Sequence, residues 1–359
     1  EMQRSLVGSE MCIRDRISSL PKRINPHTLE KFTDYRSETV FTIDDEDTFD
    51  LDDAISIQKL SDGSYILKVY IANVEHFIGF NTPLWQRAQR LTTSTYTENG
   101  PIFHMLHPDI SCGICSLVPK VDRLAKGFIF KISPDGKILD FKIEDSLIRS
   151  KKKMTYKEVD NILNGMSAPK SYYSFIEDLI NLEHVTNLII SGLSQDTTIS
   201  YEVNEENLIK KTEIENKHQP SKMIIMICAV LVGKSVAEYL YNAGLLMVYR
   251  NHENSYYEEF KRLLKKYNKK VKAFDKTQDE YVINKIIDSI KNKEEFLVFT
   301  SLIINSASKA YYDIKNVGHY ALNTEAYSHT TSPIRRFSDL LIQFIPVSYT
   351  HLTLPTIRL

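Results

Sequence analysis

The sequence has few cysteines and no long apolar run. Four cysteines in 359 residues are too few for the disulfide framework of a small secreted protein. The longest apolar run, residues 223–233, is shorter than the ~20 residues that cross a bilayer, and no apolar segment flanked by basic residues stands near the N-terminus. We therefore expect a cytoplasmic protein without a membrane span, in which residues 223–233 form a buried helix.

An excess of charge of either sign is also lacking. Lys plus Arg number 45 and Asp plus Glu number 46, so whole-chain charge argues neither for nor against a nucleic-acid partner, and local clustering must decide. Hydrophobic residues make up 42% and charged residues 25%, which is typical of a globular protein and excludes a disordered one.

Cys112 and Cys115 have the CxxC spacing of some zinc and redox sites. No second CxxC and no nearby pair of histidines completes a tetrahedral zinc site. Reduced structural cysteines are therefore the preferred interpretation.

The two ends of the chain differ from the rest. Residues 1–16 and 346–359 resemble translated sequencing-adapter read-through, so we interpret both as non-native and leave them out of the fold prediction. Genuine divergent termini are the alternative. Residues 17–37 are then a short N-terminal remnant, and residues 38–345 are predicted to form one domain.

Apolar and alternating runs predict strands in the first half of this domain, and helical spacing follows beyond Tyr156. Turn signals at residues 61–64 and 134–136 predict two hairpins. The helical segment 260–271 has a basic face, which is either a solvated surface or an RNA contact. We expect an α+β fold, with a mixed sheet in the N-terminal half and helices mainly C-terminal. The predicted strands are residues 40–43, 54–57, 65–71, 128–132 and 138–143.

The densest chemical signal is acidic: seven of the ten residues 44–53 carry carboxylates. Such crowding opposes folding unless something neutralises it, and hard oxygen ligands on a fixed turn suit Mg²⁺ or Mn²⁺. A calcium EF-hand is excluded by spacing, because the loop has Phe49 where glycine is required and Ile55 where the bidentate glutamate belongs. An acidic patch without chemistry stays open as an alternative.

The cluster also has an informative spacing. Residues 42–53, Thr-Ile-Asp-Asp-Glu-Asp-Thr-Phe-Asp-Leu-Asp-Asp, resemble the signature of the RNB catalytic domain of ribonuclease II and ribonuclease R, and Tyr-Ser-His-Thr-Thr-Ser-Pro-Ile-Arg-Arg-Phe-Ser-Asp at residues 327–339 resembles a second signature. Further blocks follow in the family's order across roughly residues 40–344. They include residues 70–77, 93–96, 115–117, 121–125, 150–156, 199–202, 249–252 and 318–322.

The resemblance implies an Mg²⁺-dependent hydrolytic exoribonuclease that degrades single-stranded RNA from its 3′ end to nucleoside 5′-monophosphates. It implies that Asp44, Asp50, Asp52 and Asp53 hold the metal, with Mn²⁺ as an alternative ion. Asp50 and Asp52 are expected to be catalytic, and Arg335 to contact a phosphate through its planar guanidinium. No obligate protein partner is evident, and we expect a monomer.

Three tyrosines match family positions near the 3′ end of the RNA. Tyr96 and Tyr201 are expected to bind RNA, and Tyr156 is expected at the catalytic centre; aromatic rings stack on any base without reading sequence. For each of them, ordinary packing is the alternative. The basic run 149–153 could follow the RNA backbone, or it could be a solvated charge run.

The pattern also departs from the family. Met226 and Ile227 stand where the family usually carries paired glutamates, Asn73 where an aspartate is usual, and Gln343 and Phe344 where His-Arg is expected. A second hypothesis is therefore a catalytically weakened RNB module that mainly binds RNA. The family's flanking RNA-binding domains have no counterpart in residues 17–37, so weaker RNA binding than in a complete enzyme is expected.

Overall fold

A computed structural model describes residues 30–97, 100–196, 219–253 and 309–345, together with single positions before residue 30. The chain divides into two compact units. The first contains residues 1–189, 219–239 and 329–359, and the second contains residues 190–218 and 240–328. The predicted domain boundaries at residues 16, 37 and 345 stay a prediction.

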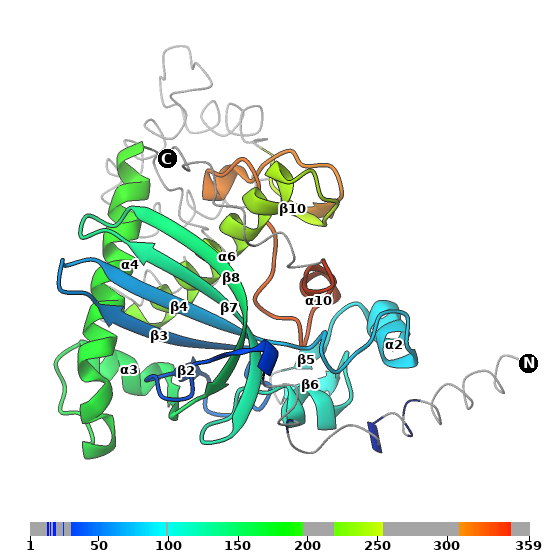
Figure 1. The fold of residues 1–359 in the computed structure, drawn as a ribbon, viewed down its shortest axis with the longest axis horizontal. Helices are drawn as coiled ribbons and strands as arrows, with labels where there is room; N and C mark the ends of the chain where they lie inside the picture. Colours follow the sequence, from blue (N-terminus) through cyan, green and yellow to red (C-terminus); the bar gives the residue numbers. More distant parts are fainter. Residues whose placement is uncertain are drawn as a thin grey trace, which may run out of the picture. The chain divides into compact units, whose positions relative to one another are not determined.

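A seven-stranded mixed sheet forms the centre of the first unit (Figure 1). The inner strands pair antiparallel, whereas each edge strand pairs parallel to its neighbour. In spatial order the strands are β1 (Thr33–Asp34), β8 (Ile138–Arg149), β7 (Asp122–Ile132), β4 (Tyr65–Ala72), β3 (Asp53–Lys59), β2 (Phe41–Asp44) and β9 (Lys152–Thr155).

Both predicted hairpins are present. Gly63 and Gly136 have φ of 83° and 89°, a conformation that glycine adopts without a steric penalty, and they turn β3 into β4 and β7 into β8. The five predicted strands correspond to β2, β3, β4, β7 and β8. Helices follow in the chain order that the α+β prediction required, so that prediction is confirmed.

Helices and short elements complete the first unit. α3 starts at Tyr156 because Thr155 and Glu158 form a reciprocal capping box. The other described elements here are α2 (Pro83–Leu91), the hairpin strands β5 (Thr95–Thr97) and β6 (Gly100–Phe103), the π-helix η2 (Asp109–Ile114), α3 (Tyr156–Leu163), the 3₁₀ helix η3 (Lys170–Phe175), α4 (Ile176–Asp196), α6 (Pro220–Asn242) and α10 (Phe337–Gln343).

The apolar run at residues 223–233 lies inside α6, a helix of 23 residues. Among the described residues it is the one helix whose length and composition would allow it to cross a membrane, and 56% of its most apolar window is buried inside the fold. A buried core helix passes the same test, in agreement with the prediction of a buried helix here.

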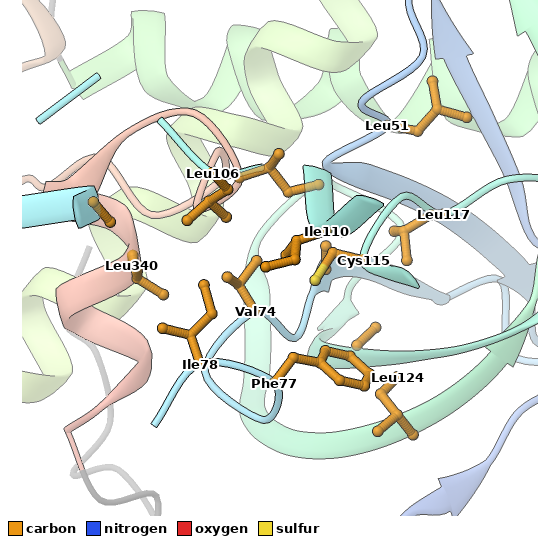
Figure 2. Close-up of a cluster of buried hydrophobic side chains, with 14 of the residues drawn as sticks. Leu51, Val74, Phe77, Ile78, Leu106, Ile110, Cys115, Leu117, Leu124 and Leu340 are labelled. Carbon is orange, nitrogen blue, oxygen red and sulfur yellow. The ribbon is translucent and has the colours of Figure 1, made fainter. Parts of the chain in front are cut away.

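A buried hydrophobic cluster includes one residue of the acidic loop, Leu51 (Figure 2). Leu51, which lies between the loop's aspartates, is 1% exposed and belongs to this cluster. Cys115 is 1% exposed in the same cluster, and neither Cys115 nor Cys112 forms a disulfide. Other members that Figure 2 labels are Val74, Phe77, Ile78, Leu106, Ile110, Leu117, Leu124 and Leu340.

Gln343, one of the departures from the family pattern, fastens α10 to the end of β4. Its side-chain oxygen accepts from the backbone N–H of Val74 at 3.0 Å and of Glu75 at 3.2 Å, and its amide donates to the carbonyl of Ala72 at 2.8 Å. The Val74 N–H and the Ala72 carbonyl also bond each other at 3.0 Å, so the Gln343 side chain adds to the hydrogen bonds of this turn and gives the Glu75 N–H an acceptor.

The second unit is described over residues 240–253 and 309–328. It contains an antiparallel pair, β10 (Tyr249–Asn251) with β11 (Tyr311–Asp313), and the 3₁₀ helix η5 (Tyr320–Leu322). The predicted basic helix at 260–271 and Tyr201 lie outside the described residues.

Candidate functional site

The acidic loop joins the end of β2 to the start of β3. These strands are antiparallel neighbours, with Phe41 opposite Ile55, so Asp44 and Asp53 lie at the same end of the sheet. Between them, burial of Leu51 fixes the loop to the core. The backbone carbonyl of Asp52 also accepts from the N–H of Ala72 at 2.8 Å. This bond extends the β3–β4 pairing into the loop. The backbone that carries the last aspartates of the loop is therefore fixed by the core and by β4.

Asp52 joins the loop to the segment 332–336, far away in the sequence. Its side chain is 5% exposed. One oxygen, Oδ1, accepts from the backbone N–H of Ile334 at 2.9 Å. The other, Oδ2, is a buried oxygen that lies 3.5 Å from Nε of Arg335 and has no hydrogen-bond partner among the described residues. Asp52 thus uses one oxygen for the backbone and keeps the other beside Arg335.

Arg335 keeps a partly exposed guanidinium beside this carboxylate, with 46% of its side chain accessible. Its backbone is fixed, because its carbonyl accepts from the N–H of Ser94 at 2.9 Å and from the hydroxyl of Thr93 at 3.0 Å. A planar cation held beside a cluster of carboxylates is suited to binding a phosphate.

Two of the three predicted tyrosines lie at the cluster. Tyr96 donates its phenolic proton to Asp50 at 2.7 Å. Tyr156 follows Thr155, whose partner in the parallel β2–β9 register is Asp44. Burial raises the pKa of Tyr156, and the carboxylates of Asp53 and Asp44 raise it further, so it is a neutral hydroxyl at physiological pH.

Burial and mutual repulsion disfavour the charged forms of these aspartates. Burial raises the pKa of Asp44, and the neighbouring Asp53 carboxylate raises it further. Burial likewise raises the pKa of Asp52 and of Asp53, although Arg335 opposes both shifts. Each group therefore gains from a nearby cation.

The donor set fits a hard divalent cation. Within the described part of the chain, Asp44 Oδ2 and Asp52 Oδ2 are buried oxygens without a hydrogen-bond partner, and carboxylate oxygens are the ligands that Mg²⁺ prefers. Across the described part of the chain, no group of three or more Asp, Glu, His or Cys side chains is arranged so that it could hold a metal ion. Mg²⁺ does not require a dedicated all-protein cage, because it usually keeps several of its waters when it binds to carboxylates.

The basic run before Tyr156 is engaged with the protein along most of its length. Arg149 pairs with Asp122 at 2.6 Å, and Lys152 lies 4.0 Å from the centre of the Tyr172 ring. Lys153 donates to the carbonyls of Glu46 and Thr48, both at 2.7 Å. These three side chains are bound to other groups of the protein, so the interpretation of the run as freely solvated charges does not hold for them.

Sequence reasoning singled out neither Lys153 nor Ser116 as a site residue. Ser116 is fully buried; its hydroxyl donates to the carbonyl of Phe49 at 2.7 Å and accepts from the N–H of Leu51 at 3.0 Å. Lys153 was one member of a basic run, and Ser116 one member of a motif block. Their roles come from contacts that lie 105 and 107 positions away in the sequence for Lys153, and 65 and 67 positions away for Ser116, which no local pattern carries.

α6, the helix that carries Met226 and Ile227, lies close to the acidic cluster. Burial raises the pKa of the Cys228 thiol, and the Asp53 carboxylate raises it further. Just before it, Met226 is 38% exposed and Ile227 is 6% exposed. An apolar pair thus stands on α6 where paired glutamates were expected.

Burial of the Asp53 carboxylate, which raises its pKa, predicts a stability gain that depends on pH. In metal-free protein, Asp53→Asn is expected to raise the free energy of unfolding by about 1 kcal/mol at about pH 8. Because the folded-state pKa of Asp53 lies above its ordinary value of 3.8, the wild-type side chain stabilises the fold at low pH and loses this contribution as pH rises through the folded pKa. The gain should therefore shrink towards about pH 5.

Urea unfolding with EDTA at both pH values measures this difference. A variant that is less stable than wild type at about pH 8 would contradict the assigned cost of burying the Asp53 charge. Adding Mg²⁺ should reverse the order, because a bound cation stabilises only the protein that retains its carboxylates.

Comparisons with known proteins agree with the signatures. A model of the RNB domain matches residues 32–351. Ribonuclease R 1 of Lactococcus lactis is 30% identical over 341 residues, which are 92% of this chain and 42% of that protein. Ribonuclease R of Thermotoga maritima is 30% identical over 335 residues, 90% of this chain and 47% of the relative. The chain spans about half the length of these relatives.

Solved structures share the fold. Mycoplasma genitalium RNase R in complex with ribose-methylated single-stranded RNA superposes with a TM-score of 0.82 at 23% identity, over 95% of this chain and 54% of that chain. Yeast Ssd1, a pseudonuclease, gives 0.72 at 18% identity, over 90% and 41%. The family match over most of the length, with the relatives that accompany it, places this chain in the RNB-domain exoribonuclease family of ribonucleases R and II.

Proposed function

We propose that this chain is the catalytic region of an Mg²⁺-dependent exoribonuclease that hydrolyses single-stranded RNA from its 3′ end and releases nucleoside 5′-monophosphates. The observation that supports it best is Asp52, whose free oxygen faces Arg335 while its other oxygen holds the Ile334 backbone. This juxtaposition brings metal-binding and phosphate-binding chemistry together from two distant signatures.

In this proposal the carboxylates of Asp44, Asp50, Asp52 and Asp53 hold the metal. RNB-family nucleases are metal-dependent, and Mg²⁺, or Mn²⁺ in its place, would lower the pKa of a water and offset charge on the scissile phosphate. Arg335 contacts that phosphate or the adjacent one. Tyr156 lies at the catalytic centre as a neutral donor.

RNA binding completes the proposal. Tyr96 and Tyr201 stack on bases near the 3′ end, which gives a sequence-independent grip. Among solved structures of the same fold, M. genitalium RNase R is described in complex with single-stranded and with double-stranded RNA. We propose a cytoplasmic monomer that acts on single-stranded RNA without an obligate protein partner.

One observation favours a second candidate function. Met226 and Ile227 supply no carboxylate on α6, and the same fold occurs in a pseudonuclease. The chain would then be a catalytically weakened RNB module that mainly binds RNA. Turnover separates the two candidates, because only the first consumes its ligand.

The test is degradation of one single-stranded RNA labelled at its 3′ end or at its 5′ end, with Mg²⁺ or with EDTA. With Mg²⁺, the 3′ label should appear at once as a mononucleotide, whereas the 5′-labelled RNA should shorten progressively. EDTA should stop both reactions, because uncompensated carboxylates repel the phosphate. Internal cleavage products would refute the exonuclease mechanism, and RNA binding without turnover would favour the second candidate.

A further inference from the structure

The acidic loop is held by two side chains that are not themselves acidic. Lys153, on β9, donates from its Nζ to the carbonyls of Glu46 and Thr48, each at 2.7 Å. Ser116, on the segment after η2, binds the carbonyl of Phe49 at 2.7 Å and the N–H of Leu51 at 3.0 Å. Together they engage four backbone groups between Asp44 and Asp52.

We infer that Lys153 and Ser116 form a two-sided clamp whose task is to set the positions of Asp44 and Asp50 before the metal and RNA arrive. The inference rests on the function proposed above and adds two positioning residues to it. Neither side chain hydrogen-bonds to a carboxylate of the proposed metal set, so both act through the loop backbone.

The physical need for such a clamp follows from the loop's composition. Repulsion among carboxylates drives a flexible loop to spread them apart, yet metal and phosphate chemistry tolerates little misplacement. An ammonium group bound to two backbone carbonyls holds the loop without neutralising any one carboxylate by direct pairing. Its charge nevertheless lowers the pKa of Asp44, against the larger effects of burial and of Asp53.

The clamp also distinguishes Lys153 from its neighbour in the basic run. Lys152 lies over the Tyr172 ring and near the hydroxyl of Ser171, with no bond to the acidic loop. If the run served to bind the RNA backbone, loss of either lysine would weaken RNA binding to a similar extent. If Lys153 instead positions the loop, replacing Lys153 should lower kcat, whereas replacing Lys152 should leave both kcat and KM unchanged.

The first test compares Lys153→Met with Lys152→Met as its matched control, in the full chain with Mg²⁺ and a labelled single-stranded RNA. Lys153→Met should lower kcat between about 10-fold and 10²-fold with little change in KM. Lys152→Met should change neither constant, and Lys153→Arg should restore most of the lost kcat, because a guanidinium can also donate to both carbonyls. A rise in KM shared by both methionine variants, with kcat unchanged, would overturn the clamp in favour of RNA contact.

The second test needs no turnover. Amide hydrogen exchange of residues 44–53 is compared in EDTA for wild type, Lys153→Met, Lys152→Met and Ser116→Ala. The clamp predicts faster exchange in Lys153→Met and in Ser116→Ala, most directly at the Leu51 amide in the latter, and no change in Lys152→Met. Unchanged exchange in both clamp variants would refute the inference. An inactive wild type would refute the proposed function, while the exchange data would still decide on the clamp.

Discussion

Asp52→Asn is expected to lower the rate of RNA hydrolysis by about 10³-fold while leaving the fold intact. The size follows from the loss of a preorganised electrostatic contact at a phosphate-transfer site, which typically costs 10²–10³-fold or more. The fold survives because the amide oxygen of asparagine can still accept the Ile334 N–H, which is the structural contact of this side chain. Only the oxygen that faces Arg335 loses its charge.

Release of labelled mononucleotide under single-turnover conditions measures this effect. Asp140→Asn is the matched control: it removes the same charge from an exposed position on β8, where the carboxylate accepts from the adjacent backbone N–H of Phe141 at 2.9 Å. An Asp52→Asn protein with wild-type turnover would remove Asp52 from the catalytic centre. A variant that no longer unfolds cooperatively would instead show that asparagine cannot keep the Ile334 bond.

Asp339→Ala is expected to lower the free energy of unfolding by about 3–5 kcal/mol, the range found when one partner of a buried charge pair is removed. Asp339 is fully buried. It accepts from the backbone N–H of Ser332 at 2.9 Å and from two nitrogens of Arg336 at 2.7–3.1 Å. Alanine would leave the Ser332 N–H without this acceptor inside the fold.

Urea unfolding at neutral pH measures the loss, and Asp339→Asn gives the graded comparison. Asparagine keeps an acceptor for Ser332 and removes the charge that Arg336 contacts, so its loss should be smaller. A change below about 1 kcal/mol in Asp339→Ala would show that solvent or other groups replace these bonds. Activity should fall together with stability, because the Ser332–Arg336 segment presents Arg335 to Asp52.

Local patterns predicted the antiparallel part of the fold well. Strands with apolar alternation and glycine-containing turns can be recognised from a few consecutive residues, and β3, β4, β7 and β8 were predicted in this way. The parallel strand β9 was not predicted, because three of the four residues Lys152–Thr155 are polar or charged and Met154 is the one buried residue among them. Its pairing with β2 depends on a partner more than a hundred residues away.

For the candidate site, too, local patterns were predicted and contacts between distant residues were not. The spacing of the aspartates and the Ser-Pro-Ile-Arg-Arg block indicated which residues to group, and the structure brings Asp52 and Arg335 together. The backbone bond from Ile334 to Asp52 could not be predicted, because a main-chain donor has no sequence signature. The same holds for the carbonyls that Lys153 binds. The roles of these residues stay predictions until the variants are measured.

The bond between Asp52 and Ile334 spans 282 positions, and this has a consequence for the newly made protein. During synthesis the sheet strands emerge first, since chains fold from the N-terminus as they are produced. Residue 334 emerges only after nearly all of the chain described here. A nascent polypeptide therefore carries the acidic loop without its arginine, so the contacts of Asp52 with Ile334 and Arg335 form only after translation has passed this point.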